Sequence, residues 1–384
     1  MYWRQDVWGT QPWGLTDVNL QYSVLPPAPT LDDVLRGSST RLSRLTLTRD
    51  GVDVMELPAV TWQVTVSRQG DQRRQLTATL PAAPGLVPTG AGSVLHPASR
   101  HEVRAEMGVY DPRFGEHWAV VGVFPVSQTS LSVDAGGSSV RLACEDRASV
   151  VRNAAPTVPI AWDSGPIEDV LGDALAHLTP YIPARLYRTG LVIPAGVGGV
   201  PGCDWWKLCR DDIARAAGAD LYVNAAGEIE LRRVHDITAL SPVWSWRVQD
   251  GDVMKLDRDI DGRVMPDGVI VPWGRGKYAA YTPPTSVHTP SAVRRWVRYD
   301  GDPSLIGSES HALWVGSREW VRYGRGVERV TFDVPADYRV DAGDVAQLHA
   351  PDHGVRQVTA VDSFTLTAGS PSMTVQFAEW QVQV

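Results

Sequence analysis

The stretch Thr61-Trp62-Gln63-Val64-Thr65-Val66 alternates polar and apolar side chains at every position. Successive side chains of a β-strand point to opposite faces, so the alternation predicts a strand with one buried face and one polar face. Trp62, Val64 and Val66 then share the buried face. Trp62 is therefore predicted to lie in the core of a β-rich structure.

Strands of the same kind are predicted throughout residues 37–150. Alternation recurs at Leu76, Ala78 and Leu80, and again at Val103, Ala105, Met107 and Val109. Residues 118–124 form a continuous apolar run, which is typical of a strand buried on both faces, so Trp118 is predicted to be a second core residue. Gly136 and Gly137 indicate a hairpin. About six or seven strands with short turns predict a closed barrel or a sandwich.

Residues 151–238 change in character and predict a small α/β domain. Ser164-Gly165-Pro166 precedes a predicted helix over 167–178, because proline is tolerated in a first helical turn. Asp204 is a suitable N-cap for a second helix over 205–217. Gly218 then stands where a left-handed residue ends many helices. A β-hairpin is predicted over 221–231.

The remaining residues, 239–384, return to strands and predict a second β-barrel domain with a helical insertion. Residues 269–271 form a short apolar strand, and alternation recurs at 330–334, 364–366 and 373–377. Residues 304–323 form the predicted helix. The predicted boundaries are therefore an extended arm at 1–36, a first β-barrel domain at 37–150, the α/β domain at 151–238 and the second β-barrel domain at 239–384.

The predicted N-terminal arm is rich in tryptophan and proline. Trp3, Trp8 and Trp13 are five residues apart, a spacing that fits neither a helix face nor a strand face. Pro26, Pro27 and Pro29 cannot lie in a sheet interior. The tryptophans either fold back onto their own domain or anchor the arm on a neighbouring subunit, where tryptophan is favoured.

The composition excludes several classes of protein. The chain has 384 residues, of which 43% are hydrophobic and 21% charged, enough for two or three globular domains. A net charge of −8 disfavours a general nucleic-acid binder. Three cysteines cannot form a disulfide framework, and no apolar run is long enough for a transmembrane helix. The N-terminus lacks a signal-peptide pattern, so the chain is expected to be made in the cytoplasm and not exported by the signal-peptide route.

Two motifs begin like ligand-binding loops. Residues 195–202 are rich in glycine, but Pro201 replaces the third glycine of a dinucleotide-binding loop, so a flexible connection is expected. Asp257, Asp259 and Asp261 begin like a calcium loop, whose last ligand should be glutamate and is Gly268. A solvated turn is expected there, although binding of an ion near Asp257–Asp261 stays open.

Two further motifs contain histidine. His349 and His353 flank Pro351, which predicts a turn rather than a zinc-binding helix. Ser308 and His311 are neighbours on a predicted helix without an oxyanion loop, so a helix-capping role is expected. No catalytic residue, cofactor site or metal site is therefore predicted.

Arginines recur every three or four residues near the predicted helix at 304–323. They are Arg318, Arg322, Arg325 and Arg329. They form either a solvated face paired with Glu319 and Glu328, or a contact between subunits. The candidate assembly-interface residues are therefore Trp3, Trp8, Trp13, Arg318, Arg322 and Arg325.

Short motifs with a fixed order run along the chain. Between residues 41 and 179 they are Val60-Thr61-Trp62-Gln63-Val64, Gly85-Leu86-Val87-Pro88, Val121-Gly122-Val123-Phe124-Pro125-Val126 and the segment 142–149. This part resembles a domain family of unknown function from minor tail proteins of actinobacterial phages. Later motifs at 206–219, 224–231, 268–271 and 341–345 are similar to phage tail-hub proteins more widely.

The resemblance implies a mainly β fold in which two β-barrel-like tube domains flank an α/β domain. It implies a trimeric ring of six similar barrels, which joins a sixfold tail tube to a threefold tip. The implied partners are two further copies, a distal tail protein or tail tube, and tip, fibre or tape-measure proteins. The implied location is the tail tip or baseplate of a virion. DNA would only pass through the lumen, which the acidic charge suits.

The resemblance also implies a structural protein rather than an enzyme. Many hubs carry a lysin or fibre-docking extension, and because this sequence stops at Val384, a cell-wall hydrolase is expected to be a separate protein. Two alternatives stay open. One is the hub of a contractile injection system or gene transfer agent. The other is a carbohydrate-binding β-protein, suggested by fifteen tryptophans.

Overall fold

The computed structural model describes residues 40–68, 70, 72–111, 115–134, 137–234, 240–260, 267–282, 296–323 and 328–379. The predicted arm with Trp3, Trp8 and Trp13 lies outside the described residues, as do Arg325 and Asp261. Statements about the fold concern the described residues.

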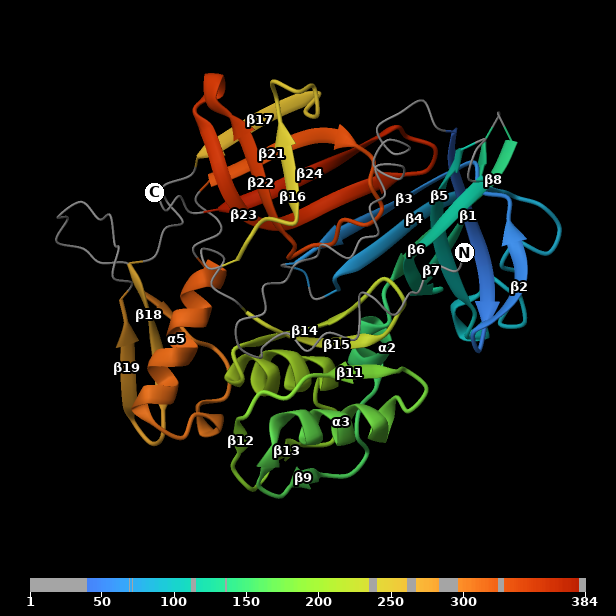
Figure 1. Ribbon diagram of the computed structural model, residues 1–384. Coiled ribbons are helices and arrows are strands. Elements are labelled where there is room, and N and C mark those ends of the chain that lie inside the picture. The colour runs from blue at the N-terminus through green and yellow to red at the C-terminus, as the bar shows by residue number, and fades with distance from the viewer. Residues whose placement is uncertain are drawn as a thin grey trace.

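A ten-stranded sheet forms the centre of the molecule (Figure 1). Its main path runs β17-β21-β24-β23-β3-β4-β8-β7, and β22 joins β23 on one side and β16 on the other. The strands are β3 (Thr61–Ser67), β4 (Arg74–Pro81), β7 (Gln128–Asp134), β8 (Gly137–Glu145), β16 (Trp244–Arg247), β17 (Lys255–Ile260), β21 (Glu328–Pro335), β22 (Val345–Ala350), β23 (Val355–Thr367) and β24 (Ser372–Glu379). The predicted strand at 61–66 is thus confirmed as β3.

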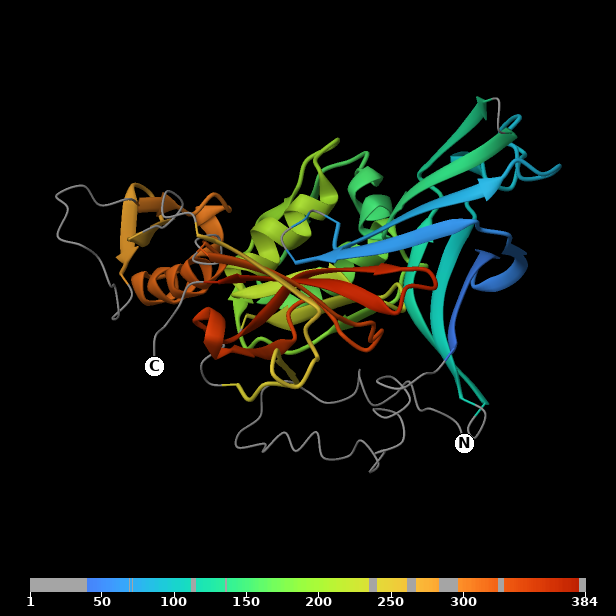
Figure 2. The same cartoon turned by 90° about the horizontal axis from the view of Figure 1, so that it is seen from above.

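A four-stranded antiparallel sheet packs against one end of the large sheet. Its order is β2-β1-β5-β6, with β1 (Thr40–Arg49), β2 (Val52–Leu57), β5 (Glu102–Asp111) and β6 (Gly115–Pro125). Leu45 and Leu47 of β1 join Trp62 and Val64 of β3 in one hydrophobic core. Figure 2 shows β3 and β4 leading from the red C-terminal strands toward this smaller sheet.

The first and last β-regions of the chain are joined directly. β23 pairs antiparallel with β3, so Leu366 stands opposite Val64. The same hydrophobic core contains Phe332 and Phe377 from the last region. The predicted fold class, mainly β with a smaller α/β part, is confirmed. No sheet closes into a barrel within the described ranges, because β7 and β17 end the large sheet on opposite sides without pairing with each other.

The α/β part lies below the large sheet in Figure 1. Its helices are α2 (Ala148–Asn153), α3 (Ile167–Leu178) and α4 (Trp205–Lys207), which continues as a π-helix over Leu208–Ala214. Its strands are β9 (Ile160–Trp162), β10 (Gly165–Pro166), β11 (Ala184–Leu186), β12 (Val192–Ile193), β13 (Val197–Gly199), β14 (Ala219–Val223) and β15 (Ile229–Arg233). The predicted helix at 167–178 and the predicted hairpin are both confirmed.

The ends of the second helix follow the sequence prediction. The Asp204 carboxylate accepts a hydrogen bond from the backbone amide of Lys207 at 2.9 Å, which is the expected N-cap. Gly218 has φ +55°, and a Cβ at this position would approach the Trp314 ring to 2.5 Å. Glycine is therefore required there both by the backbone conformation and by the close packing of the next unit.

That next unit is a small sheet covered by one long helix. Its elements are β18 (Gly268–Trp273), β19 (Lys277–Tyr281), β20 (Trp296–Arg298) and α5 (Glu309–Tyr323), with a short 3₁₀ turn at Pro303–Leu305. Val269 and Val271 pack against Val315 of the helix. The predicted helix at 304–323 is confirmed from residue 309 onward. No described helix is both long enough and apolar enough to cross a membrane.

Three local predictions are wrong. Trp118 is only half buried, because β6 is the last strand of the four-stranded sheet and the Arg44 guanidinium lies 4.3 Å from the Trp118 ring. The glycine-rich segment is not simply a flexible connection, because residues 197–199 form β13 paired with β9. Asp257 and Asp259 do not lie in a turn but in β17, which pairs with β21.

Candidate functional site

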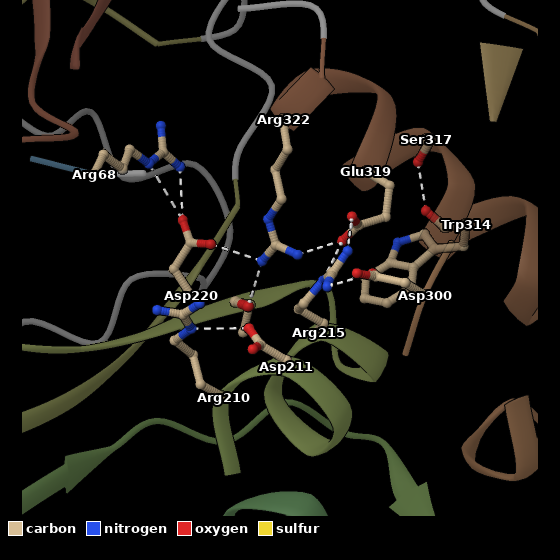
Figure 3. A network of polar contacts seen from close by, with 11 residues as sticks. Arg68, Arg210, Asp211, Arg215, Asp220, Asp300, Trp314, Ser317, Glu319 and Arg322 are labelled. Atoms are coloured by element: carbon tan, nitrogen blue, oxygen red, sulfur yellow. Dashed lines mark hydrogen bonds and ion pairs between the residues drawn. The ribbon is translucent and has the colours of Figure 1, made fainter. Parts of the chain in front are cut away.

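Arg322, one of the candidate assembly residues, makes its contacts inside the molecule. It lies on α5 and donates to Asp220 Oδ1 and to the carbonyl oxygen of Ala219, both at 2.6 Å (Figure 3). It also pairs with Glu319, one turn earlier on the same helix. Asp220 and Ala219 belong to β14, so the hydrogen bonds of Arg322 connect α5 to the α/β part.

Glu319 is the most deeply buried acid of this contact, with a side chain only 1% exposed. Arg215, from the end of the second helix, pairs with it at 2.6 Å and also reaches the exposed Asp300 at 2.7 Å. Burial disfavours the charge of Arg215, but the hydrogen bond and charge of Glu319 outweigh it and raise the pKa of Arg215. The carboxylate is therefore held between two arginines that are charged at any physiological pH.

Asp220 extends the contact to the large sheet. Arg68, directly after β3, pairs with Asp220 at 2.8 Å. Burial lowers the pKa of Arg68, whereas the neighbouring Asp220 favours its charged form. Arg68, Arg215, Asp220, Glu319 and Arg322 together form what we call the polar junction, where the large sheet, the α/β part and the α5 unit meet (Figure 3).

The chemistry of the polar junction is structural. Its acids and bases pair with each other, and paired, hydrogen-bonded charges are the form in which ions are tolerated in a protein interior. Beside it lies a hollow of about 30 Å³, lined by Arg68, Asp220 and Arg232 among others. That space suits one or two water molecules rather than a substrate.

Sequence reasoning placed Arg318 and Arg322 correctly on a helix but missed the polar junction. The Arg318 guanidinium lies 5.8 Å from the Trp314 ring on the same helix. The contacts of Arg215 with Glu319 and of Arg68 with Asp220 join residues 104 and 152 positions apart. No local spacing signals such pairs, so only the fold could reveal them.

A second buried polar contact joins the β-regions to α2. Arg74 of β4 pairs with Asp341 at 2.7 Å, and its backbone amide donates to Asp146 Oδ2 at 2.8 Å. Asp146 Oδ1 accepts from the amide of Ala148 at the start of α2. Burial opposes ionisation of Asp341, but Arg73 and Arg74 outweigh it and hold its pKa below the ordinary value.

Asp146 is expected to make stability depend on pH. Burial outweighs its hydrogen bonds and raises its pKa to about 6, from an ordinary value of 3.8. The folded chain then binds a proton more readily than the unfolded chain, so the contribution of Asp146 to stability decreases as pH rises from about 4 to about 6. The full change is about 3 kcal/mol. Urea unfolding of wild type and Asp146→Asn measures it.

The stability difference, wild type minus Asp146→Asn, should be larger at pH 4.5 than at pH 7. Asparagine replaces one of the two acceptor oxygens of Asp146 with an amide nitrogen. The cost of this lost hydrogen bond to stability is the same at both pH values, so it cancels in the comparison. A difference that is the same at both pH values would contradict the raised pKa.

The histidine motifs have local roles. Ser308 accepts a hydrogen bond from the amide of His311 at 3.1 Å, which confirms the predicted capping of α5. His311 Nε2 lies 2.8 Å from the carbonyl oxygen of Ala216 and so joins α5 to the second helix. His353 ends a 3₁₀ turn, Pro351–His353, as predicted. Within the described segments, no three His, Cys, Asp or Glu residues lie close enough to hold a metal ion.

Comparison with known proteins gives matches of structure alone. No family model and no curated protein sequence matches the chain. The tail protein from Neisseria meningitidis MC58 is similar with a TM-score of 0.64 and 10% identity, over 88% of this chain and 97% of that one. The 43 kDa tail protein of prophage MuSo2 from Shewanella oneidensis is similar with a TM-score of 0.58 and 11% identity, over 88% of this chain and 98% of that one.

Prophage tail protein gp18 from Listeria monocytogenes gives a TM-score of 0.51 and 10% identity, over 88% of this chain and 96% of that one. The c3393 protein of E. coli, a component of the type VI secretion system, is similar with a TM-score of 0.51 and 9% identity, over 88% of this chain and 77% of that one. The chain therefore has the fold of phage tail-hub-like proteins, as predicted.

Proposed function

We propose that this chain is a structural protein of a phage or prophage tail and forms the hub at the tail tip or baseplate. The observation that carries the proposal is the extent of the structural likeness. It covers 88% of this chain and 97% of the Neisseria tail protein, so the likeness spans nearly the whole of that protein rather than one shared module. A structural rather than catalytic role also suits the polar junction, whose charges fix the three parts of the fold against each other.

Three copies form a ring in this proposal. Subunits that meet head to tail form closed rings when the rotation between them closes. The large sheet offers two different ends for such a contact, β7 on one side and β17 on the other. The ring joins a sixfold tail tube or distal tail protein to a threefold tip, with tip, fibre or tape-measure proteins as further partners. A net charge of −8 suits a lumen through which DNA passes without binding.

A second candidate is the corresponding hub of a contractile injection system. The similarity to the c3393 protein, a type VI secretion component, favours it. The genes beside the coding sequence distinguish the two, since capsid and terminase genes accompany a phage.

A reconstruction of the assembled tail tests the proposal. Three copies of the chain should form one ring at the tail end, with the two β-regions of each copy as six similar units. One copy or six copies per ring would contradict the trimer. Absence of the chain from purified tails, measured by mass spectrometry, would contradict the function itself.

A further inference from the structure

The edge strand β7 is open to pairing with a further strand. β7 and β17 end the main path of the large sheet, and no described strand pairs with their outer sides (Figure 1). The outward N–H and C=O groups of an edge strand form a template for another strand, and charged side chains usually guard against such pairing. Four of the six residues of β17 are charged, whereas residues 128–133 of β7 include no charged residue. β7 is therefore the unguarded end of the sheet.

The buried face of the large sheet continues onto β7 and becomes exposed there. Leu80 of β4 stands opposite Val140 of β8, and Val140 opposite Leu131 of β7, so the three side chains form one row on the same face. Leu80 and Val140 are fully buried. Leu131 is 47% exposed, and Val133, the next residue of β7 on this face, is 71% exposed. A further strand with one apolar face would continue the row and cover both side chains.

A segment with this pattern lies in the chain before the described residues. It reads Val18-Asn19-Leu20-Gln21-Tyr22-Ser23-Val24, in which apolar residues alternate with uncharged polar ones at all seven positions. Such alternation predicts a strand with one apolar and one polar face. Two prolines follow at positions 26 and 27, where a strand is expected to end. The segment thus matches β7 in length, in its lack of charge and in having one apolar face.

The segment can reach β7 of its own chain. Thr48, Glu102 and Pro125 stand in one row across β1, β5 and β6, and β7 begins three residues after Pro125. The path from the start of β1, along this strand and across the row to the start of β7, is at most about 45 Å at the usual strand dimensions. Residues 25–39 connect the segment to β1 and span up to about 50 Å when extended.

The same geometry gives the direction of pairing and favours the segment of the same chain. Val24 is the end of the segment nearest to β1, so it arrives at the start of β7, and the segment then runs antiparallel to β7. A tethered segment within reach of its site has an effective concentration in the millimolar range. The corresponding segment of a second copy has this advantage only inside an assembly.

We infer that residues 18–24 add to β7 of the same chain as an antiparallel strand, with their apolar side chains on the face of Leu131 and Val133. Strand addition of this kind gains affinity from backbone hydrogen bonds and specificity from alternate side chains. The inference goes beyond the proposed hub function, because it concerns the single chain. The added strand then forms this end of the large sheet, so a ring contact at that end involves it.

Photo-cross-linking of the purified full-length protein tests the inference. A photoreactive amino acid replaces Leu131, and the irradiated protein is separated on a denaturing gel and digested for tandem mass spectrometry. The expected product migrates as a single chain and joins position 131 to a residue within 18–24. The matched control carries the photoreactive amino acid at Val52, which is 68% exposed on the edge strand β2. It should give no adduct with residues 18–24.

Two aspartate variants test which face of the segment is covered. Tyr22→Asp places a charge on the apolar face and should reduce the adduct from position 131 about tenfold, because burying an unpaired charge is unfavourable. Gln21→Asp, the neighbouring change on the polar face, should alter the yield less than about twofold, since that side chain stays in water. Circular dichroism confirms that each variant is folded.

The outcomes separate the inference from the proposed function. An adduct with another segment, an adduct that joins two chains, or no adduct at all overturns the inference. An equal loss with Tyr22→Asp and Gln21→Asp also overturns it, because the effect would not depend on the face. Each of these results leaves the hub function standing, since that function is tested by the presence and number of chains in assembled tails.

Discussion

Replacing Trp62 with alanine should destabilise the protein by about 3–5 kcal/mol, the usual cost of removing a large aromatic side chain from a core. Trp62 is 4% exposed and lies on β3, where β4 pairs on one side and β23 on the other. The cavity would open where the first and last β-regions meet, so both regions should lose stability together. Urea unfolding followed by circular dichroism measures the loss.

Trp118→Ala is the matched control because it removes the same side chain from a half-buried position. This variant loses the contact with Arg44 and a hydrogen bond to Glu116 at 3.0 Å, together about 1 kcal/mol. The loss should therefore be much smaller than for Trp62→Ala. An equal loss in both variants would place Trp118 in the core and contradict the observed edge position of β6.

Glu319→Gln is the second change with a large expected effect. It removes the buried negative charge between Arg215 and Arg322, and breaking a buried ion pair from one side costs about 3–5 kcal/mol. The lower end of this range is expected, since Asp300 still pairs with Arg215 and Asp220 with Arg322. The variant should unfold at lower urea concentration than wild type, with the α5 unit affected first, as hydrogen exchange of its amides would report.

Glu309→Gln is the control for this change, because Glu309 lies exposed in the first turn of the same helix. Removing its charge affects only the interaction with the helix dipole, at most about 1 kcal/mol. If the two glutamine variants lost the same stability, Glu319 would not be the centre of the polar junction.

Local sequence features determined much of the secondary structure. Alternation at 61–66 gave the strand β3, and the helix at 167–178 has the predicted bounds. Asp204 and Gly218 delimit the second helix because capping and left-handed conformations depend on one or two neighbouring residues. The overall class, β-rich with a smaller α/β part, follows from the sum of such features.

Tertiary structure alone determined how these elements combine. The pairing of β3 with β23 joins residues about 300 positions apart. The alternation of polar and apolar residues in either strand does not indicate with which strand it pairs. Trp118 is half exposed because β6 ends its sheet, although its apolar run is typical of a central strand. The polar junction likewise depends on contacts between distant segments. Sequence periodicity reports which face of an element is buried, whereas the partner that buries it depends on the packing of the whole chain.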